Sequence, residues 1–364
     1  SLTWKIFFCI SRDPVVPRQL TLQLTSMAVG PVGKASPAAA ARPAKTHPAP
    51  ADFSAVTGNS KDAPMATAIP FRRALEFSYG VSDSLSPLIR RVIANNPSPF
   101  TFHGTGTYII GRGEVAVIDA GPDLDSHVEA LLSALEGETV SHLLVTHTHR
   151  DHSPATRHLK AATGAKSYGF GPHGGGRMGD EVEEGGDHDF MPDVTLGDGD
   201  IIHGAGWTIE ALHTPGHTSN HLCFALKEEN TLFSGDHVMG WSTTVVSPPD
   251  GDMADYMASL ERLGARPETV FWPTHGPAIE APSEFIAALI AHRKSREVQI
   301  SDCLQDGVAR IPDMVRRMYA DVDPVLYGAA ARSVLAHLIH MVQSGRAACA
   351  GEPAAASEFT PPAN

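Results

Sequence analysis

Three histidines and an aspartate lie close together in the run His147-Thr-His-Arg-Asp-His152. The apolar run at 142–146 before them predicts a buried strand, and Ser153-Pro154 after them predicts the first turn of a helix. A loop at the end of a strand can direct several side chains toward one point. Imidazole and carboxylate groups are ligands that zinc and similar divalent ions accept in proteins. The run therefore predicts part of a metal site.

Three more potential ligands each follow a later apolar run. They are His217 after the predicted strand 207–212, Asp236 after 230–233, and His275 after 268–270. One short run cannot supply all the ligands for two ions, so downstream ligands of this kind are required. The simpler interpretation is that these histidines are only buried or solvated. It would require every position to follow a separate strand by coincidence, so we favour the metal site.

Together these motifs resemble the metallo-β-lactamase superfamily of metal-dependent hydrolases. The resemblance implies an α/β protein of the four-layer αβ/βα sandwich type, with a two-metal site at the strand ends. It implies that one ion is held by His147, His149 and His217, and the other by Asp151, His152 and His275, with Asp236 bridging the two. It also implies that Asp119, at the end of an early strand, supports the ligands without binding metal. The implied cofactor is two divalent metal ions. Zinc is favoured, although ligands of these types also suit iron and manganese.

Three further histidines neighbour these ligands without belonging to the implied set: His213, His221 and His237. A supporting or packing role is more common for such a histidine than proton donation to a leaving group. We assign a supporting role to His213 at this stage.

Two loops beyond the ligands could shape a substrate site. Residues 241–250 follow Asp236 and are a candidate substrate wall. Residues 169–200 begin with a glycine-rich run and carry nine carboxylates between Asp180 and Asp200, with no Lys or Arg there. A solvated surface loop is the simpler interpretation, and a rim over the metal site is the alternative. An acidic rim would repel polyanions and would disfavour an RNA substrate.

Composition narrows the class of protein. The formal charge of −13 over 364 residues disfavours nonspecific binding to nucleic acid or acidic membranes. The four cysteines are far apart and form no CxxC pair, which indicates neither a zinc ribbon nor a disulfide framework. No apolar run is long enough to cross a bilayer. We therefore expect a cytoplasmic protein with no membrane partner. The sequence does not indicate an oligomeric state.

The chain is predicted to divide into four segments. Residues 1–66 are rich in Ala, Pro, Ser and Lys and predict a disordered leader, either a targeting peptide or translated upstream sequence. Residues 67–282 alternate strands and helices, which predicts an α/β domain, and the resemblance implies that this is the metallo-β-lactamase-fold catalytic domain. Residues 283–346 predict a helical domain, and 347–364 predict a disordered tail.

The helical segment sharpens the resemblance. Helices are predicted from Ser283 to about Asp306, from Ile311 to about Ala320, and from Asp323-Pro324 onward. The runs His149-Arg-Asp-His-Ser-Pro and His213-Thr-Pro-Gly-His-Thr, with Ser242–Val246 and Ala291-His-Arg-Lys-Ser-Arg-Glu297, resemble the β-lactamase-like protein 2 family. That resemblance implies a small winged-helix-like domain after the core. The residues after Gly345 are poor strand formers, which predicts that the β-wing is missing.

These inferences predict a binuclear metal-dependent hydrolase that uses a metal-bridging hydroxide on a small carbonyl substrate: an ester, thioester, lactone or β-lactam. Asp236 would set the separation of the ions, and Asp151 would also accept the hydroxide proton. One alternative is a single-strand RNA endonuclease of the β-lactamase-like protein 2 type, with RNA as its partner. Another is a non-catalytic metal-binding protein, which the complete ligand set disfavours. The acidic balance favours a small-molecule substrate.

Overall fold

The computed structural model describes residues 68–176, 185–320 and 322–362. The predicted leader at 1–66, and part of the acidic segment, lie outside the described residues.

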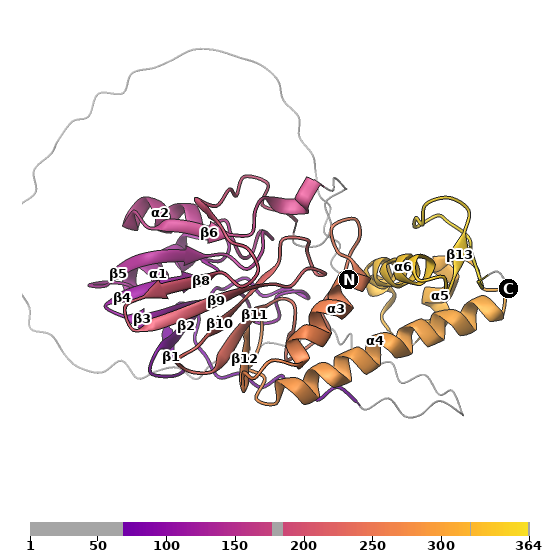
Figure 1. The fold of residues 1–364 in the computed structure, drawn as a ribbon, viewed down its shortest axis with the longest axis horizontal. Coiled ribbons are helices and arrows are strands. Elements are labelled where there is room, and N and C mark those ends of the chain that lie inside the picture. The colour runs from indigo at the N-terminus through magenta and orange to yellow at the C-terminus, as the bar shows by residue number, and fades with distance from the viewer. Residues whose placement is uncertain (1–67, 177–184, 321, 363–364) are drawn as a thin grey trace, which may run out of the picture. The chain divides into compact units, whose positions relative to one another are not determined.

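Two β-sheets form the centre of the described structure (Figure 1). The first has seven strands in chain order: β1 (Ser82–Ser84), β2 (Ile89–Ile93), β3 (Gly106–Arg112), β4 (Glu114–Ile118), β5 (Thr139–Leu144), β6 (Lys166–Gly169) and β7 (Val194–Thr195). The second sheet has five strands in the spatial order β12-β11-β10-β9-β8. Their bounds are β8 (Ile201–Gly204), β9 (Trp207–His213), β10 (Leu222–Leu226), β11 (Thr231–Gly235) and β12 (Val270–Pro273). β4 to β7 run parallel, and so do β11 and β12. The predicted hairpin is confirmed as the antiparallel pair β3–β4.

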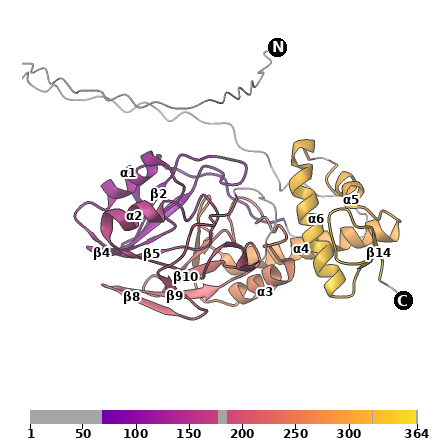
Figure 2. The same ribbon diagram turned by 90° about the horizontal axis from the view of Figure 1, so that it is seen from above.

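Helices cover the outer faces of both sheets (Figure 2). α1 (Asp125–Ala134) and α2 (Thr156–Thr163) pack on the first sheet, and α3 (Met253–Gly264) and α4 (Pro282–Gln305) pack on the second. A third core, which includes Tyr108, Phe224 and Phe233, fills the space between the sheets. Strands buried on both faces need continuous apolar runs, which is why the sequence of β10 is Leu-Cys-Phe-Ala-Leu with every residue buried. This is the predicted four-layer αβ/βα sandwich.

The C-terminal part is helical and shares α4 with the sandwich. α5 (Ile311–Met318), the short 3₁₀ turn Pro324–Leu326 and α6 (Tyr327–Gln343) follow it. Phe285 and Leu289 of α4 pack on the second sheet, whereas Ile300 and Leu304 belong to the C-terminal core. The boundary predicted at 282/283 thus falls at the start of a helix that serves both cores. Ser283 lies inside α4 and does not cap it, because the helix begins at Pro282.

The end of the chain differs from the prediction of a disordered tail without a wing. β13 (Ala348–Cys349) pairs antiparallel with β14 (Phe359–Thr360). The residues between β13 and β14 have low strand propensity, so strand propensity does not explain why these two strands pair. Phe359 is only 1% exposed and packs into the C-terminal core, and this burial holds β14 in place.

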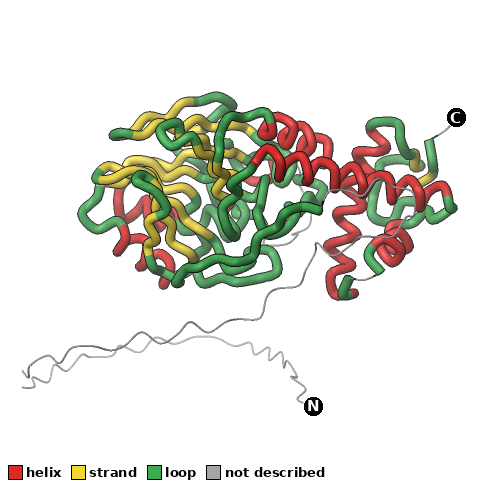
Figure 3. Tube along the Cα trace, turned by 90° about the horizontal axis from the view of Figure 1, so that it is seen from below, coloured by secondary structure: helices red, strands yellow, loops and turns green. Residues whose placement is uncertain are grey.

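Long loops gather at the end of the sheets nearest the C-terminal helices (Figure 3). Among the described residues, no helix has both the length and the apolar content needed to cross a bilayer.

Candidate metal centre

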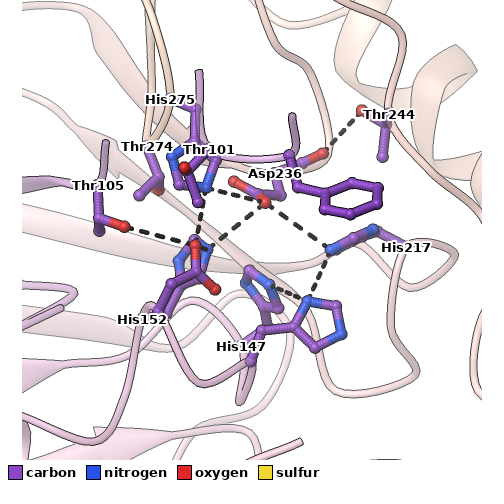
Figure 4. A network of polar contacts seen from close by, with 12 residues as sticks. Thr101, Thr105, His147, His152, His217, Asp236, Thr244, Thr274 and His275 are labelled. Atoms are coloured by element: carbon purple, nitrogen blue, oxygen red, sulfur yellow. Dashed lines mark hydrogen bonds and ion pairs between the residues drawn. The ribbon is translucent and has the colours of Figure 1, made fainter. Parts of the chain in front are cut away.

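The predicted ligands and Asp119 occupy loops that follow five different strands. Asp119 follows β4, the hexapeptide 147–152 follows β5, His217 follows β9, Asp236 follows β11, and His275 follows β12. Loops at the carboxyl ends of parallel strands meet at one edge of a sheet. The two sheets bring these ends together, and Figure 4 shows His152, His217 and His275 directed toward Asp236.

The structure brings all seven predicted ligands into one cluster, which we call the ligand cluster: His147, His149, Asp151, His152, His217, Asp236 and His275. Within it, one potential ligand atom from each of three residues lies within 4.8 Å of the others in three groups: His147 with His149 and His217, His147 with His152 and Asp236, and Asp151 with His152 and His275. The first and third groups are the two triads that the family resemblance implies. Their assignment as metal ligands stays a prediction.

Three nitrogens of the first triad face one another at short range. His149 Nδ1 lies 3.0 Å from His147 Nε2 and 3.1 Å from His217 Nε2. The nitrogens of a tetrahedral zinc site, each about 2.0 Å from the ion, lie roughly 3.3 Å apart. The spacing is therefore close to what a shared ion requires.

Hydrogen bonds on the far side of two rings, His217 and His275, direct the Nε2 of each ring into the cluster. His217 Nδ1 donates to the carbonyl oxygen of Val245 at 2.6 Å, and His275 Nδ1 donates to that of Gly104 at 3.2 Å. A carbonyl oxygen can only accept, so each Nδ1 carries a proton and each Nε2 is the ring nitrogen that faces the cluster. The backbone thus fixes the tautomer that a metal site needs.

Asp119 organises the second layer around the cluster. Its carboxylate is fully buried and accepts hydrogen bonds from the Thr146 amide and hydroxyl at 2.8 Å, from His152 Nδ1 at 2.9 Å and from Thr274 Oγ1 at 3.1 Å. Asp119 has a φ of +51°, a left-handed conformation that Asp and Asn tolerate better than most residues. This geometry agrees with the supporting role that the resemblance implies for Asp119, and that role stays a prediction.

Asp236 lies between the two triads. Its Oδ2 is 3.9 Å from His217 Nε2, 3.5 Å from His152 Nε2 and 3.4 Å from His275 Nε2. Asp151 Oδ2 is 3.0 Å from His275 Nε2 and 3.3 Å from His152 Nε2. Asp236 is therefore the one carboxylate of the cluster near rings of both triads, as a bridging ligand must be.

Several buried atoms of the cluster lack a partner. Among the described residues, Asp151 Oδ1, His152 Nε2 and Asp236 Oδ1 form no hydrogen bond. A buried polar atom without a partner is costly, and the donor set of imidazole nitrogens and carboxylate oxygens suits divalent ions. The cluster thus fits the cations that the family resemblance implies.

The charges of the cluster depend on one another. Burial and the nearby rings lower the pKa of His147 and His149 well below the usual value, so these imidazoles are neutral, the form that binds metal. Burial alone would also lower the pKa of His275, but Asp236 and Asp151 raise it to about 10. Burial alone would raise the pKa of Asp236, but His275 and His152 hold it well below its usual value. The carboxylates therefore stay charged and attract a cation.

Local sequence positions the loop that carries His217. Gly216 has a φ of +137°, and a Cβ there would lie 2.3 Å from the Tyr256 Cα of α3. Only glycine permits so close an approach. The turn Thr-Pro-Gly before His217 therefore seats its loop against α3.

His213 does not lie where the sequence-based assignment puts it. Its Nε2 contacts the Ser219 carbonyl oxygen at 3.0 Å, and its ring stacks on Phe170 at 3.9 Å. Within the described part of the chain, no hydrogen bond or ion pair joins His213 to the ligand cluster. His221 contacts the cluster instead, because its Nε2 accepts the backbone N–H of Asp236 at 3.2 Å. Sequence alone could not separate the two, since both flank the same loop.

Other supporting groups were also missed. The hydroxyls of Thr146 and Thr274 bind Asp119, and each threonine directly precedes a ligand, which was the available signal. The carbonyl groups of Gly104 and Val245 had no signal, because every residue has one.

Comparisons with known proteins agree with this geometry. Residues 101–275 match the family model described as "Metallo-beta-lactamase superfamily", and residues 311–355 match "Beta-lactamase associated winged helix domain". The second match, together with the β13–β14 pair, shows that the prediction of a missing wing was wrong.

Three relatives illustrate the similarity. A lactamase-like protein of Aspergillus niger is 30% identical over 82% of this chain and 98% of its own length. A beta-lactamase-like protein 2 homolog of Caenorhabditis elegans is 32% identical over 66% of this chain and 79% of its own. An atrochrysone carboxyl ACP thioesterase of Aspergillus terreus is 33% identical over 60% of this chain and 63% of its own length.

Solved structures share the fold. A metallo-beta-lactamase family protein from Thermus thermophilus superposes with a TM-score of 0.63 at 22% identity, covering 76% of this chain and all of the other. A beta-lactamase domain protein from Burkholderia ambifaria has a TM-score of 0.65 at 19% identity, and the match covers 86% of this chain and 97% of the other.

Proposed function

The chain belongs to the metallo-β-lactamase superfamily of metal-dependent hydrolases, and on that premise we propose that it holds two divalent ions, with zinc favoured, and cleaves a small carbonyl substrate. Thioesters are the first substrate class to test. One observation carries the proposal. Seven buried or half-buried side chains from four loops converge, and Asp236 lies between the two triads.

The chemistry divides between the ions and the chain. When bound, two divalent ions supply a water of lowered pKa and a Lewis acid for the carbonyl oxygen. Asp236 Oδ2 would hold both triads at a fixed separation. Asp151 Oδ1 has no hydrogen-bond partner among the described residues and would accept the proton that the nucleophile gives up.

The choice of thioesters rests on the relatives. Several proteins of about 30 to 33% identity are named atrochrysone carboxyl ACP thioesterases. The same cluster would serve an ester, lactone or β-lactam, because all present a carbonyl to the same nucleophile. RNA is the other substrate to include, and the nine carboxylates at 180–200 argue against it.

The test is a panel of substrates offered to the zinc-loaded protein: a thioester, an ester, a lactone, a chromogenic β-lactam and a labelled single-stranded RNA. We expect the thioester to be cleaved with the highest kcat/KM. Cleavage of RNA alone would replace this proposal with the endonuclease alternative.

Two variants connect the activity to the cluster. Asp236→Ala should lower kcat/KM by at least about 10³-fold and reduce bound metal measured by elemental analysis. Asp198→Ala, which removes an exposed carboxylate paired with Arg262, is the matched control and should change neither. An Asp236→Ala protein that keeps both its metal and its activity would refute the assignment.

A further inference from the structure

A hollow lies beside the segment 241–245, which follows Asp236 in the chain. It measures about 760 Å³ including its opening and lies between the segment 241–245, α4 and α6. Its walls are largely apolar and include Phe100, Met239, Trp241 and Leu326. Two arginines of α4, Arg293 and Arg296, also line it. We call it the arginine pocket.

Both arginines are buried without a carboxylate partner. Arg293 is 3% exposed and Arg296 is 4% exposed. Arg293 donates to the Thr244 carbonyl oxygen and lies 5.1 Å from the centre of the Tyr256 ring, and its Nε has no hydrogen-bond partner. Arg296 donates to Gln299 Oε1 at 2.8 Å and lies over the Tyr319 ring at 4.8 Å. Among the described residues, no carboxylate oxygen lies within 4.0 Å of either guanidinium.

Uncompensated buried charge of this kind is rare. Buried arginines in proteins are normally paired, because an isolated cation in a dry site loses its hydration without replacement. Glu297, the residue after Arg296 in the chain, is already engaged by His340 at 2.8 Å, by His337 and by Arg346. The two guanidinium groups therefore leave a net positive field in the pocket.

The pKa values of two neighbouring histidines are lowered by burial, and the two guanidinium groups lower them further. Burial and then Arg293 and Arg296 lower the pKa of His292, which lines the pocket, to about 3. The pKa of His337 is lowered to about 4, chiefly by burial, with Arg293 and Arg296 contributing although Glu297 opposes them. The rings are neutral, so they add no positive charge and compete for no anion.

One wall of the pocket, the segment 241–245, is hydrogen-bonded to residues of the ligand cluster. The Val245 carbonyl oxygen accepts from His217, and Thr244 Oγ1 donates to the Asp236 carbonyl oxygen at 2.7 Å. Figure 4 shows Thr244 beside Asp236. On the other wall, Phe100 precedes Gly104, whose carbonyl oxygen accepts from His275. The segment 241–245 is therefore both a wall of the pocket and a hydrogen-bonding partner of the ligand cluster.

We infer that the arginine pocket binds an anionic end group of the substrate, a carboxylate or a phosphate, while the apolar walls hold the adjoining carbon chain. This inference rests on the proposed function, because it assigns a second contact to the same substrate. Arg296 is the principal anion contact. Arg293 also anchors the segment 241–245 through Thr244, so its replacement would disturb the cluster as well.

The test compares two matched pairs of thioesters on the metal-loaded protein. Glutaryl and pentanoyl N-acetylcysteamine thioesters differ by a carboxylate on the acyl side. Pentanoyl thioesters of phosphopantetheine and pantetheine differ by a phosphate on the thiol side. We expect at least about a tenfold higher kcat/KM for the anionic member of one pair, which also identifies the anion. Equal values in both pairs, with the thioesters cleaved, would overturn the inference and leave the proposed function standing.

Variants of residues that line the arginine pocket test whether the preference for the anionic substrate arises there. Arg296→Met should reduce the anionic preference to less than about twofold, whereas Arg316→Met, which removes an exposed arginine of α5, should keep it. If Arg296→Met does not fold, Ser333 of α6, which lines the pocket, offers a second route. Ser333→Asp supplies an internal carboxylate and should abolish the preference and raise Tm relative to the neutral Ser333→Asn. A preference that survives Ser333→Asp would refute the assignment.

A binding measurement separates the inference from the proposed function. If no thioester is cleaved, the choice of thioesters fails, and the pocket is judged by calorimetric titration of Asp236→Ala with glutarate and with inorganic phosphate. Saturable binding that Arg296→Met weakens at least about tenfold supports the pocket. No binding of either anion overturns it.

Discussion

The ligand cluster and the arginine pocket share the segment 241–245, but they treat buried charge in different ways. In the cluster, carboxylates and imidazoles lie 3.0 to 3.9 Å apart and offset one another's charges, and Asp119 supports them from behind. In the pocket, Arg293 and Arg296 have no carboxylate within 4.0 Å among the described residues. The two regions therefore suit ligands of opposite charge: the cluster suits cations and the pocket suits an anion.

Removal of divalent ions is the strongest test of that contrast. Chelation should lower thioester hydrolysis by at least about 10³-fold, because the chain alone has no nucleophile of comparable strength at the cluster. Added zinc, manganese or iron(II) should restore activity to different extents and identify the effective metal. The pocket needs no metal, so calorimetry should still detect anion binding in the chelated protein. Full activity in metal-free protein would remove the distinction between the regions.

The C-terminal core provides a second contrast, since it lies away from the cluster. Phe359→Ala should cost about 3 to 5 kcal/mol in the unfolding of this core, as expected when a fully buried phenylalanine leaves a cavity. Chemical denaturation followed by circular dichroism measures the loss. Phe359→Leu is the conservative control and should cost far less. Bound metal per folded molecule should not change, and a loss of metal in Phe359→Ala would mean that the two regions are one cooperative unit.

The two regions also differ in how far the sequence predicts them. Four of the seven cluster residues lie in one hexapeptide, and the others each follow an apolar run, so pattern and spacing were enough to select them. Arg293 and Arg296 are three residues apart in a helix that also carries exposed charges, and nothing local distinguishes them from a solvated face. Their burial depends on how α4 packs beside the segment 241–245.

The same limit explains the errors at the level of single elements. Pairing of β9 with β10 places His213 opposite Leu222 and turns its ring toward Phe170, and that register is not visible in the sequence. The β13–β14 pair depends on burial of Phe359, a contact made across the whole C-terminal core. Fold class followed from strand and helix alternation, whereas both of these details needed tertiary packing.

Asp119 allows a finer test within the cluster. Asp119→Asn keeps the size and tolerates the positive φ, but it replaces an acceptor oxygen with an NH₂ group that cannot serve the Thr146 donors and His152 at once. Metal affinity or kcat/KM should fall by about 10- to 100-fold. Asp123→Asn, in the same loop but exposed, is the control. An unchanged metal affinity in Asp119→Asn would show that the ligands are oriented without this carboxylate.

The smallest effect is expected when Glu297 is replaced. Glu297 carries a paired charge beside the arginine pocket, so its replacement can be compared with replacement of the unpaired arginines. Burial alone would raise the pKa of Glu297, but hydrogen bonds from His337, His340 and Arg346 hold it below its usual value. A carboxyl group with a depressed folded-state pKa stabilises the fold above the unfolded-state pKa of about 4.3, and that contribution declines as the pH falls below it.

Glu297→Gln should therefore lower the free energy of unfolding by about 1 to 2 kcal/mol at pH 7, with the difference from wild type shrinking below about pH 4. Denaturant titrations at several pH values measure this difference. Glu284→Gln, at the exposed start of α4, is the matched control and should show no such trend. A difference that stays constant down to pH 3 would mean that Glu297 acts by shape alone.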